Sequence, residues 1–287
     1  MVRRLDNGYC LGIIGCTVLQ DELIHVLRRD NDLRHLAIIE SEPGDRFMDR
    51  ARPKLAHLDL EIARLSSPES FRDKNGFSVL LDMKTTSLHR DPDTFRKEVI
   101  LTCQRMRPHV DGVLLFYGLC RNALRKMGKV SEEVGIPVTI LRDALGREVD
   151  DCFGALMGGR DAYLEHMTDH RGTMFIIPGY AELWYGKLSS KDVEKALEAY
   201  QNLKFVFERC GYTKLLRLDT HLCDQEEFES RVETFARMFD MQLSSEVADL
   251  SVFDSSFALA KRMVQGELQE KPSLVEPTTI PTLIQPF

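Results

Sequence analysis

Three of the seven cysteines follow strand-like segments, at points where a ligand site could form. Cys16 ends the first apolar run, Cys120 follows the run 113–117, and Cys152 follows the run 137–141. Three thiolates can hold zinc or an iron–sulfur cluster and leave one coordination position open. Thiols at helix starts also ionise more readily, because the helix dipole favours the thiolate. The pattern therefore points to one metal site at Cys16, Cys120 and Cys152.

The cysteines also have a plainer interpretation, because free cysteine often packs as a small buried apolar side chain. Cys103 lies inside a predicted helix among apolar neighbours and is expected to belong to the core. His221 and Cys223 could add ligands at the same edge, although Asp224 is expected to cap the helix that follows them. The cysteine count is odd and no CxxC pair occurs, so we expect neither a disulfide framework nor a zinc ribbon.

Residues beside these cysteines could cradle a cofactor. A glycine turn between a strand and a helix lets the backbone approach an anion or a cofactor closely. We therefore expect cofactor contacts from four neighbours of the cysteines, namely Gly15, Tyr117, Gly118 and Asn122. Neither GxGxxG nor a P-loop is present, and no Ser-His-Asp or HExxH arrangement is visible. The sequence thus names no reaction and leaves open whether the protein is an enzyme.

Three acidic residues, Asp143, Asp150 and Asp151, could be ligands or acid–base groups near the same edge. A solvated loop explains them equally well. The sequence alone does not separate these two interpretations.

Strands that alternate with helices would position these residues. Apolar runs predict buried parallel strands at 11–18, 36–39, 77–83, 113–117, 137–141, 174–177 and 214–218. Amphipathic stretches predict helices at 21–29, 94–107, 153–166, 191–209, 225–239 and 253–269, with shorter ones near 55–65 and 123–127. The order predicts a Rossmann-like α/β fold with a mostly parallel sheet flanked by helices. Ligands in such folds bind outside the carboxyl ends of the strands.

Each half of the chain contains enough elements for a lobe. We predict an N-terminal α/β lobe at 1–145, a C-terminal α/β lobe at 146–270, and an extended tail at 271–287 that holds four prolines. Whether the two halves share one sheet does not follow from the sequence.

Charge and hydropathy exclude several classes of protein. The net charge of −7 argues against a general nucleic-acid binder, which needs a basic face. No apolar run reaches the roughly 18 residues that span a bilayer. The apolar stretch after Arg3 and Arg4 is too short for a signal peptide, so we expect a cytoplasmic protein with reduced thiols and no membrane contact. A homo-oligomer is compatible with these properties.

Four segments together resemble a known family. They are 114–122 (LLFYGLCRN), 150–152 (DDC), 156–163 (LMGGRDAY) and 172–180 (GTMFIIPGY). The pattern resembles a prokaryotic domain family of unknown function with a Tyr-Gly-Leu-Cys-x-Asn motif, and it covers roughly residues 11–185. Arg121 stands where that family usually has glycine, and Asp150 stands where it usually has histidine. These departures do not touch the three cysteines.

Members of that family are common in anaerobes and methanogens and are often encoded near corrinoid-dependent methyltransferases. The resemblance implies a metal or iron–sulfur protein that serves corrinoid or one-carbon methyl-transfer metabolism, with a corrinoid protein or a methyltransferase as partner. The alternative is a metal-free small-molecule-binding module or enzyme that uses the same strand-end cleft.

Overall fold

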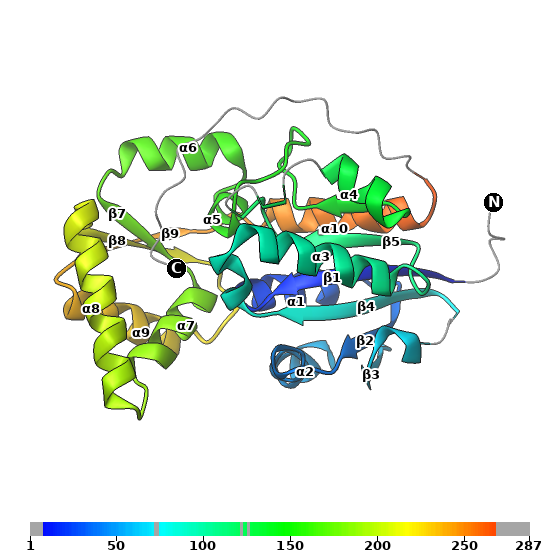
Figure 1. Ribbon diagram of the computed structural model, residues 1–287, viewed down its shortest axis with the longest axis horizontal. Helices are drawn as coiled ribbons and strands as arrows, with labels where there is room; N and C mark the ends of the chain where they lie inside the picture. The colour runs from blue at the N-terminus through cyan, green and yellow to red at the C-terminus, as the bar shows by residue number, and fades with distance from the viewer. Residues whose placement is uncertain (1–7, 72–74, 121–122, 125–126, 268–287) are drawn as a thin grey trace.

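Two sheets of parallel strands make up the protein (Figure 1). The computed structural model describes residues 8–71, 75–120, 123–124 and 127–267. The first sheet has the strand order β3-β2-β4-β1-β5-β6, and the second has the order β7-β8-β9. All pairings between these strands are parallel, so the predicted Rossmann-like α/β fold is confirmed.

The first sheet is built around a fully apolar central strand. Its strands are β1 (Tyr9–Cys16), β2 (Leu33–Ile39), β3 (Glu61–Leu65), β4 (Phe77–Lys84), β5 (Gly112–Phe116) and β6 (Val138–Ile140). β1 pairs with β4 on one side and β5 on the other, and its residues from Cys10 onward are buried. The chain winds outward from β1 through β2 to β3, and from β4 back across to β5 and β6. The direction of winding therefore reverses at the centre, where such folds place ligands.

Helices cover both faces of this sheet (Figure 1). α1 (Gln20–Arg28) lies between α2 (Glu42–Leu55) and α10 (Ser251–Val264), while α3 (Pro92–Met106) packs against α4 (Met127–Val134) on the other face. Although α10 follows the second sheet in the chain, it packs against β1 and β5. No helix in the described ranges is both long and apolar enough to cross a membrane.

The second sheet follows along the chain. Its strands are β7 (Thr173–Ile176), β8 (Lys214–Asp219) and β9 (Gln242–Val247), and its helices are α5 (Cys152–Leu156), α6 (Arg160–Asp169), α7 (Pro178–Leu188), α8 (Val193–Cys210) and α9 (Gln225–Met238). α7 contacts α8, α9 and the short 3-10 helix η1 (Thr17–Leu19) that follows β1. This last contact joins the two sheets. The division into lobes at residue 145 stays a prediction, and the predicted tail lies largely outside the described residues.

Several local predictions were wrong. The helix placed near 55–65 is instead α2, which begins after Ser41 because the Ser41 hydroxyl accepts from the Gly44 amide at 3.0 Å, and 61–65 is the edge strand β3. The single helix predicted at 153–166 is broken into α5 and α6, since Gly158 and Gly159 both take positive φ. α7 and β9 were not predicted. Residues 123–124 form a turn, and the helix expected there begins at Met127 as α4.

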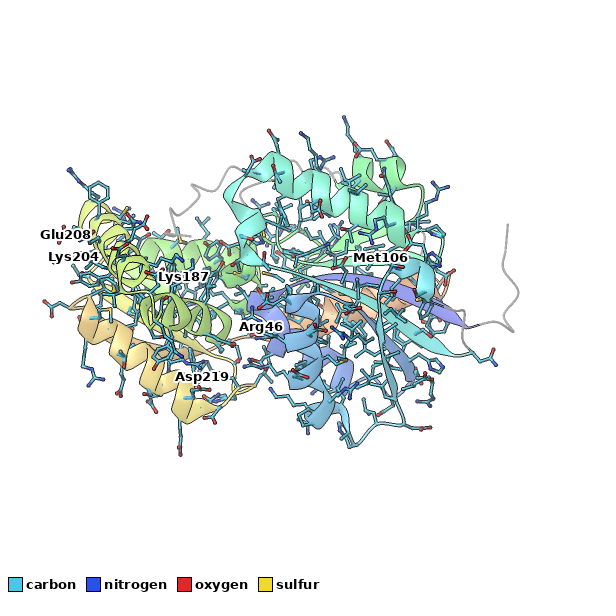
Figure 2. All side chains as sticks on the ribbon, turned by 60° about the horizontal axis from the view of Figure 1, so that its bottom comes forward. Arg46, Met106, Lys187, Lys204, Glu208 and Asp219 are labelled. Carbon is cyan, nitrogen blue, oxygen red and sulfur yellow. The ribbon has the colours of Figure 1, made fainter. Side chains whose placement is uncertain are left out.

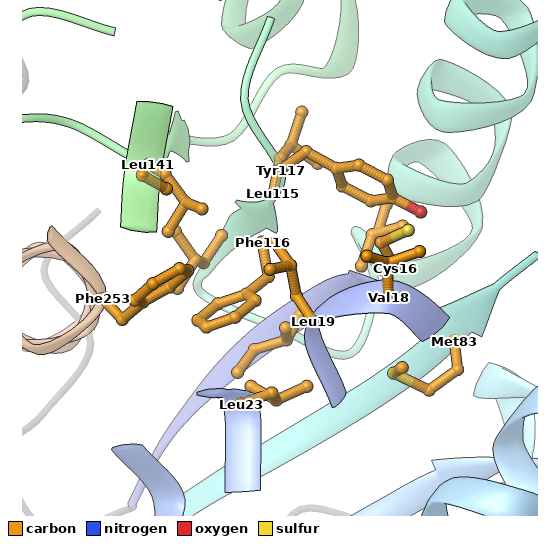
Figure 3. Close-up of a cluster of buried hydrophobic side chains, with 14 of the residues drawn as sticks. Cys16, Val18, Leu19, Leu23, Met83, Leu115, Phe116, Tyr117, Leu141 and Phe253 are labelled. Atoms are coloured by element: carbon orange, nitrogen blue, oxygen red, sulfur yellow. The ribbon is translucent and has the colours of Figure 1, made fainter. Parts of the chain in front are cut away.

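The hydrophobic core extends to the carboxyl ends of the central strands. Cys16, Val18 and Leu19 lie among Phe116, Tyr117 and other buried side chains at the ends of β1 and β5 (Figure 3). Apolar packing therefore surrounds the edge where the sequence predicts a ligand site.

Candidate metal centre

The three predicted cysteines and one tyrosine gather where the two sheets meet. Cys16 ends β1, Cys120 follows β5, Cys152 follows β6, and Tyr180 follows β7. Each therefore leaves the carboxyl end of a parallel strand, the edge at which this fold class binds ligands.

Cys16 is held at the end of a rigid strand. It is 4% exposed and extends β1 into η1. The neighbouring strand fixes it from the side, because the Tyr117 hydroxyl donates to the Gly15 carbonyl at 3.1 Å. Gly15 packs against Met83 and Leu23, so its visible role is close packing beside the cysteine.

Cys120 sits in a sharp turn after β5. Its φ is +43°, a conformation uncommon for a residue other than glycine. The Cys120 amide donates to the Asp150 carbonyl at 2.9 Å, which ties this turn to the segment before Cys152. Gly118 permits the approach, since a Cβ at Gly118 would lie 2.6 Å from the Asp151 Cα. Gly118 thus allows the turn that carries Cys120 to approach the segment before Cys152. Gly118 was predicted to contact a cofactor, and the structure gives it this steric role.

Cys152 begins α5, and its neighbour Asp151 caps that helix. The Asp151 carboxylate accepts from the Gly154 amide at 2.9 Å and from the Tyr163 hydroxyl at 2.9 Å. Cys152 Sγ donates to the Tyr180 hydroxyl at 3.9 Å. Asp151 therefore serves the local structure as a cap and also places an acid beside the thiols.

Tyr180 is a site residue that the sequence analysis did not select. Its ring stacks on Phe153 with centroids 5.4 Å apart, and it is 6% exposed. Gly179 lets this residue reach the site, because a Cβ at Gly179 would lie 2.1 Å from the Val18 carbonyl oxygen. The available signal was Pro178 and Gly179 directly after a strand, within the segment that carries the family resemblance.

Burial determines the acidity of the three thiols. Burial raises the pKa of Cys120 well above its ordinary value, and the Cys16 thiol raises it further. The pKa of Cys152 is raised by burial, then by Asp151, Cys120 and Cys16. Burial raises the pKa of Cys16 to about 12. The prediction that these thiols ionise more readily was therefore wrong, because desolvation raises their pKa values more than a helix start lowers them. Without a metal, the three thiols are protonated.

The spacing of the sulfurs bears on a mononuclear site. Among the described residues, the three sulfurs are not a group of ligand atoms that all lie within 4.8 Å of one another. Ligand sulfurs around a single zinc ion are roughly 3.5–4 Å apart. The three thiols are therefore not arranged as a ready mononuclear zinc site.

Glu22 is a second residue that the sequence analysis missed. It lies in α1, is 1% exposed, and its Oε2 has no hydrogen-bond partner among the described residues. Burial, and after it the charge of Asp21, raise the pKa of Glu22 to about 8. The charges of Arg50 and Lys54 lower this pKa but do not cancel the rise. Its charge in turn raises the pKa of Cys16. The helical pattern of the sequence does not single out Glu22, because an acidic residue is expected on the exposed face of a helix, whereas Glu22 is buried.

As the pH rises, the metal-free Glu22→Gln variant should lose less stability than the metal-free wild type. A carboxyl with a raised pKa in the folded state favours folding while protonated, and this advantage disappears as pH rises from about 4.5 to about 8. At about 1.4 kcal/mol per pH unit the change is at most about 5 kcal/mol, and relaxation around the charge reduces it. Urea midpoints across this range measure it. Parallel pH profiles for the two proteins would contradict the prediction.

The remaining candidate residues have separate outcomes. Asn122, predicted to contact a cofactor, lies outside the described residues. Asp224 caps α9 by accepting from the Glu227 amide at 3.0 Å, so the capping interpretation is confirmed. Cys103 is fully buried in the core. Asp143 binds Arg147 and the backbone of its own loop, which is the structural rather than the chemical interpretation of that aspartate.

An open pocket lies next to the cysteines on the outside. It has a volume of about 240 Å³ and is lined by Thr17, Val18, Gly179 and neighbouring residues of α2 and α7. Arg46 of α2 and Lys187 of α7, both labelled in Figure 2, are among its lining residues. The junction beside it is closed by Arg50, whose guanidinium binds Asp21 at 2.8 Å and Glu182 at 2.9 Å. The pocket is thus lined by charges of both signs, since Glu182 lies with Arg46 and Lys187 and Arg46 also pairs with Glu42 at 3.0 Å.

Comparison with known proteins gives a family without a known activity. The family model described as "Protein of unknown function (DUF1638)" matches residues 84–256, which include Cys120, Cys152 and Tyr180 but not Cys16. No curated protein matches the sequence. Among solved structures, signal recognition particle receptor FtsY from Elizabethkingia anophelis in complex with GDP is 11% identical, with a TM-score of 0.30 over 48% of this chain. The similarity spans 50% of that chain and carries no functional argument.

Proposed function

Since the chain belongs to the DUF1638 family of proteins of unknown function, we propose that Cys16, Cys120 and Cys152 ligate an iron–sulfur cluster with one iron open to a further ligand. The observation that carries this proposal is the placement of the three cysteines at the carboxyl ends of β1, β5 and β6, with the Cys120 amide bonded at 2.9 Å to the Asp150 carbonyl just before Cys152. A cluster needs less closely spaced sulfurs than a single zinc ion does, and the three sulfurs are not all within 4.8 Å of one another among the described residues.

The surroundings of the thiols support a cation. Besides burial, Asp151, Glu22 and the other thiols raise the pKa values of the three cysteines. The thiols are neutral without a metal, and their thiolate forms would need a positive centre here, because unpaired buried charge is costly. Binding would release the thiol protons, and metal affinity should therefore rise with pH.

Tyr180 would adjust such a centre. With Cys152 ionised, the Tyr180 hydroxyl becomes the donor in the contact that now measures 3.9 Å. Hydrogen bonds to ligand sulfurs and exclusion of water both set the reduction potential of a cluster. A cluster with an open position can pass electrons or hold a small ligand, and the pocket beside Cys16 would give that ligand or a partner access.

The family resemblance supports a role in corrinoid or one-carbon methyl-transfer metabolism. Members are often encoded near corrinoid-dependent methyltransferases, and a redox or ligand-holding centre would serve such a system. A corrinoid protein or a methyltransferase is the partner that this proposal names.

The pocket favours one alternative, a metal-free module that binds a small anion between Arg46 and Lys187. Anaerobic purification from iron-supplemented cells separates the two. The cluster predicts iron and acid-labile sulfide in equal amounts, together with visible absorption that reduction bleaches. Reduced cysteines with neither iron nor sulfide, before and after anaerobic reconstitution, would remove the proposal.

A further inference from the structure

We infer that His166, His170 and Glu246 form a second metal site, which binds one divalent transition-metal ion such as Zn²⁺. It lies between α6 and the edge strand β9 and uses none of the residues around the cysteines. The proposal is independent of the cluster.

The two histidines share one helix face. They are four residues apart, a spacing that places side chains one above the other on a helix. Their rings are stacked, with centroids 5.4 Å apart and planes 18° apart. His166 lies in the last turn of α6, and His170 is the residue that ends it. Both rings therefore turn toward the same neighbour.

That neighbour is Glu246, which faces each ring with a different oxygen. Glu246 Oε2 is 3.6 Å from His166 Nδ1, and Oε1 is 3.8 Å from His170 Nε2. Both distances are too long for hydrogen bonds. In keeping with this, the buried Nδ1 atom of His166 has no hydrogen-bond partner in the part of the chain that the structure describes.

A metal ion fits the space that these distances leave. Zinc lies about 2.0–2.2 Å from nitrogen and oxygen ligands, so ligand atoms in a tetrahedral site are about 3.4 Å apart. One ligand atom from each of the three residues already lies within 4.8 Å of the others, so these atoms would draw together by at most about 1.4 Å when an ion binds. The ion would supply the partner that His166 Nδ1 lacks.

The ligand types select the metal. Two imidazoles and a carboxylate favour zinc and its neighbours in the transition series over magnesium or calcium, which prefer oxygen ligands. The side chains are 25%, 36% and 39% exposed, so an ion can enter from solvent and keep a water in its fourth position. Bound metal would fasten α6 to β9 and stabilise the second sheet, because a ligand that binds only the folded state raises its stability.

The experiment titrates the full chain with Co²⁺ and Zn²⁺ after metal removal under reducing conditions. Cobalt bound by thiolates absorbs intensely in the near ultraviolet, whereas cobalt bound by imidazole and carboxylate shows only weaker visible bands. In the wild type, one Co²⁺ ion per chain should give only the weaker visible bands, separate from any cobalt bound by the cysteines. Zn²⁺ should raise the melting temperature of the wild type. In His166→Gln, His170→Gln and Glu246→Gln, this ion should bind about 100-fold more weakly or worse, since even an outer-shell partner is worth tenfold to hundredfold. Any thiolate absorption at the cysteines should remain.

His35→Gln is the matched control. His35 Nδ1 lies 3.3 Å from Glu61 Oε2 and is similarly exposed, but it has no second histidine in that pair. Its metal binding should equal that of the wild type. Glu246→Gln preserves the shape of the side chain, so it tests the site even if a histidine variant fails to fold. Unchanged affinity in folded Glu246→Gln and His170→Gln, or an equal loss in His35→Gln, would overturn the site.

Discussion

Replacing Cys120 with serine is expected to lower the iron bound per chain about tenfold or more while leaving the fold intact. Serine keeps the size of cysteine but offers oxygen, a poorer ligand than sulfur for the iron of a cluster. The unusual φ of +43° at this position is not aggravated, because serine and cysteine share the same Cβ. Iron and sulfide per chain after anaerobic purification, with circular dichroism as the check on folding, measure the effect.

Cys103→Ser is the control for this prediction. Cys103 is fully buried, with burial raising its pKa to about 12, and it lies in α3 and packs into the core. A serine hydroxyl there costs about 1–3 kcal/mol if it is left unpaired, and it should leave iron content unchanged. Equal iron in wild type and Cys120→Ser would show that Cys120 is no ligand.

The sequence was sufficient to place three cysteines at one edge of the first sheet, because the reasoning needed only strand direction. Apolar runs without alternation are buried parallel strands, and residues that follow such strands share one edge. Cys16, Cys120 and Cys152 satisfy this rule irrespective of helix boundaries. The acidity of the thiols could not be predicted in the same way, since it depends on how completely the two sheets close over them.

The contribution of the second sheet was harder to predict. Its edge strand β9 has the sequence QLSSEV and is mostly exposed, so no apolar run marks it. Glu246 was therefore not placed opposite His166 and His170, and the predicted helix 153–166 ended before His170. α7 begins with Pro178 and Gly179, directly after the predicted strand 174–177, and no helix was predicted there, although proline is well suited to the first turn of a helix. Tyr180 was missed for that reason.

Gly179→Ala should destabilise the protein by about 3 kcal/mol or more, at the upper end of what overpacking costs. The added Cβ would lie 2.1 Å from the Val18 carbonyl oxygen and 2.6 Å from the Val18 Cα, and backbone atoms cannot rotate away as a side chain would. The start of α7 must then move from η1, and with it Tyr180, which touches Cys152. We therefore expect lower iron retention together with lower stability, measured by denaturant unfolding and iron analysis.

Gly186→Ala, in the same helix, separates this steric effect from helix propensity. A Cβ at Gly186 meets nothing within 4 Å, so alanine there should stabilise the protein by up to about 1 kcal/mol and leave the iron content unchanged. If Gly179→Ala matched Gly186→Ala in both measurements, the contact between α7 and η1 would not position the site. Opposite signs in the two variants would instead tie the cysteine centre to the junction of the two sheets, because a single carbon atom at that junction would disturb thiols on three different strands.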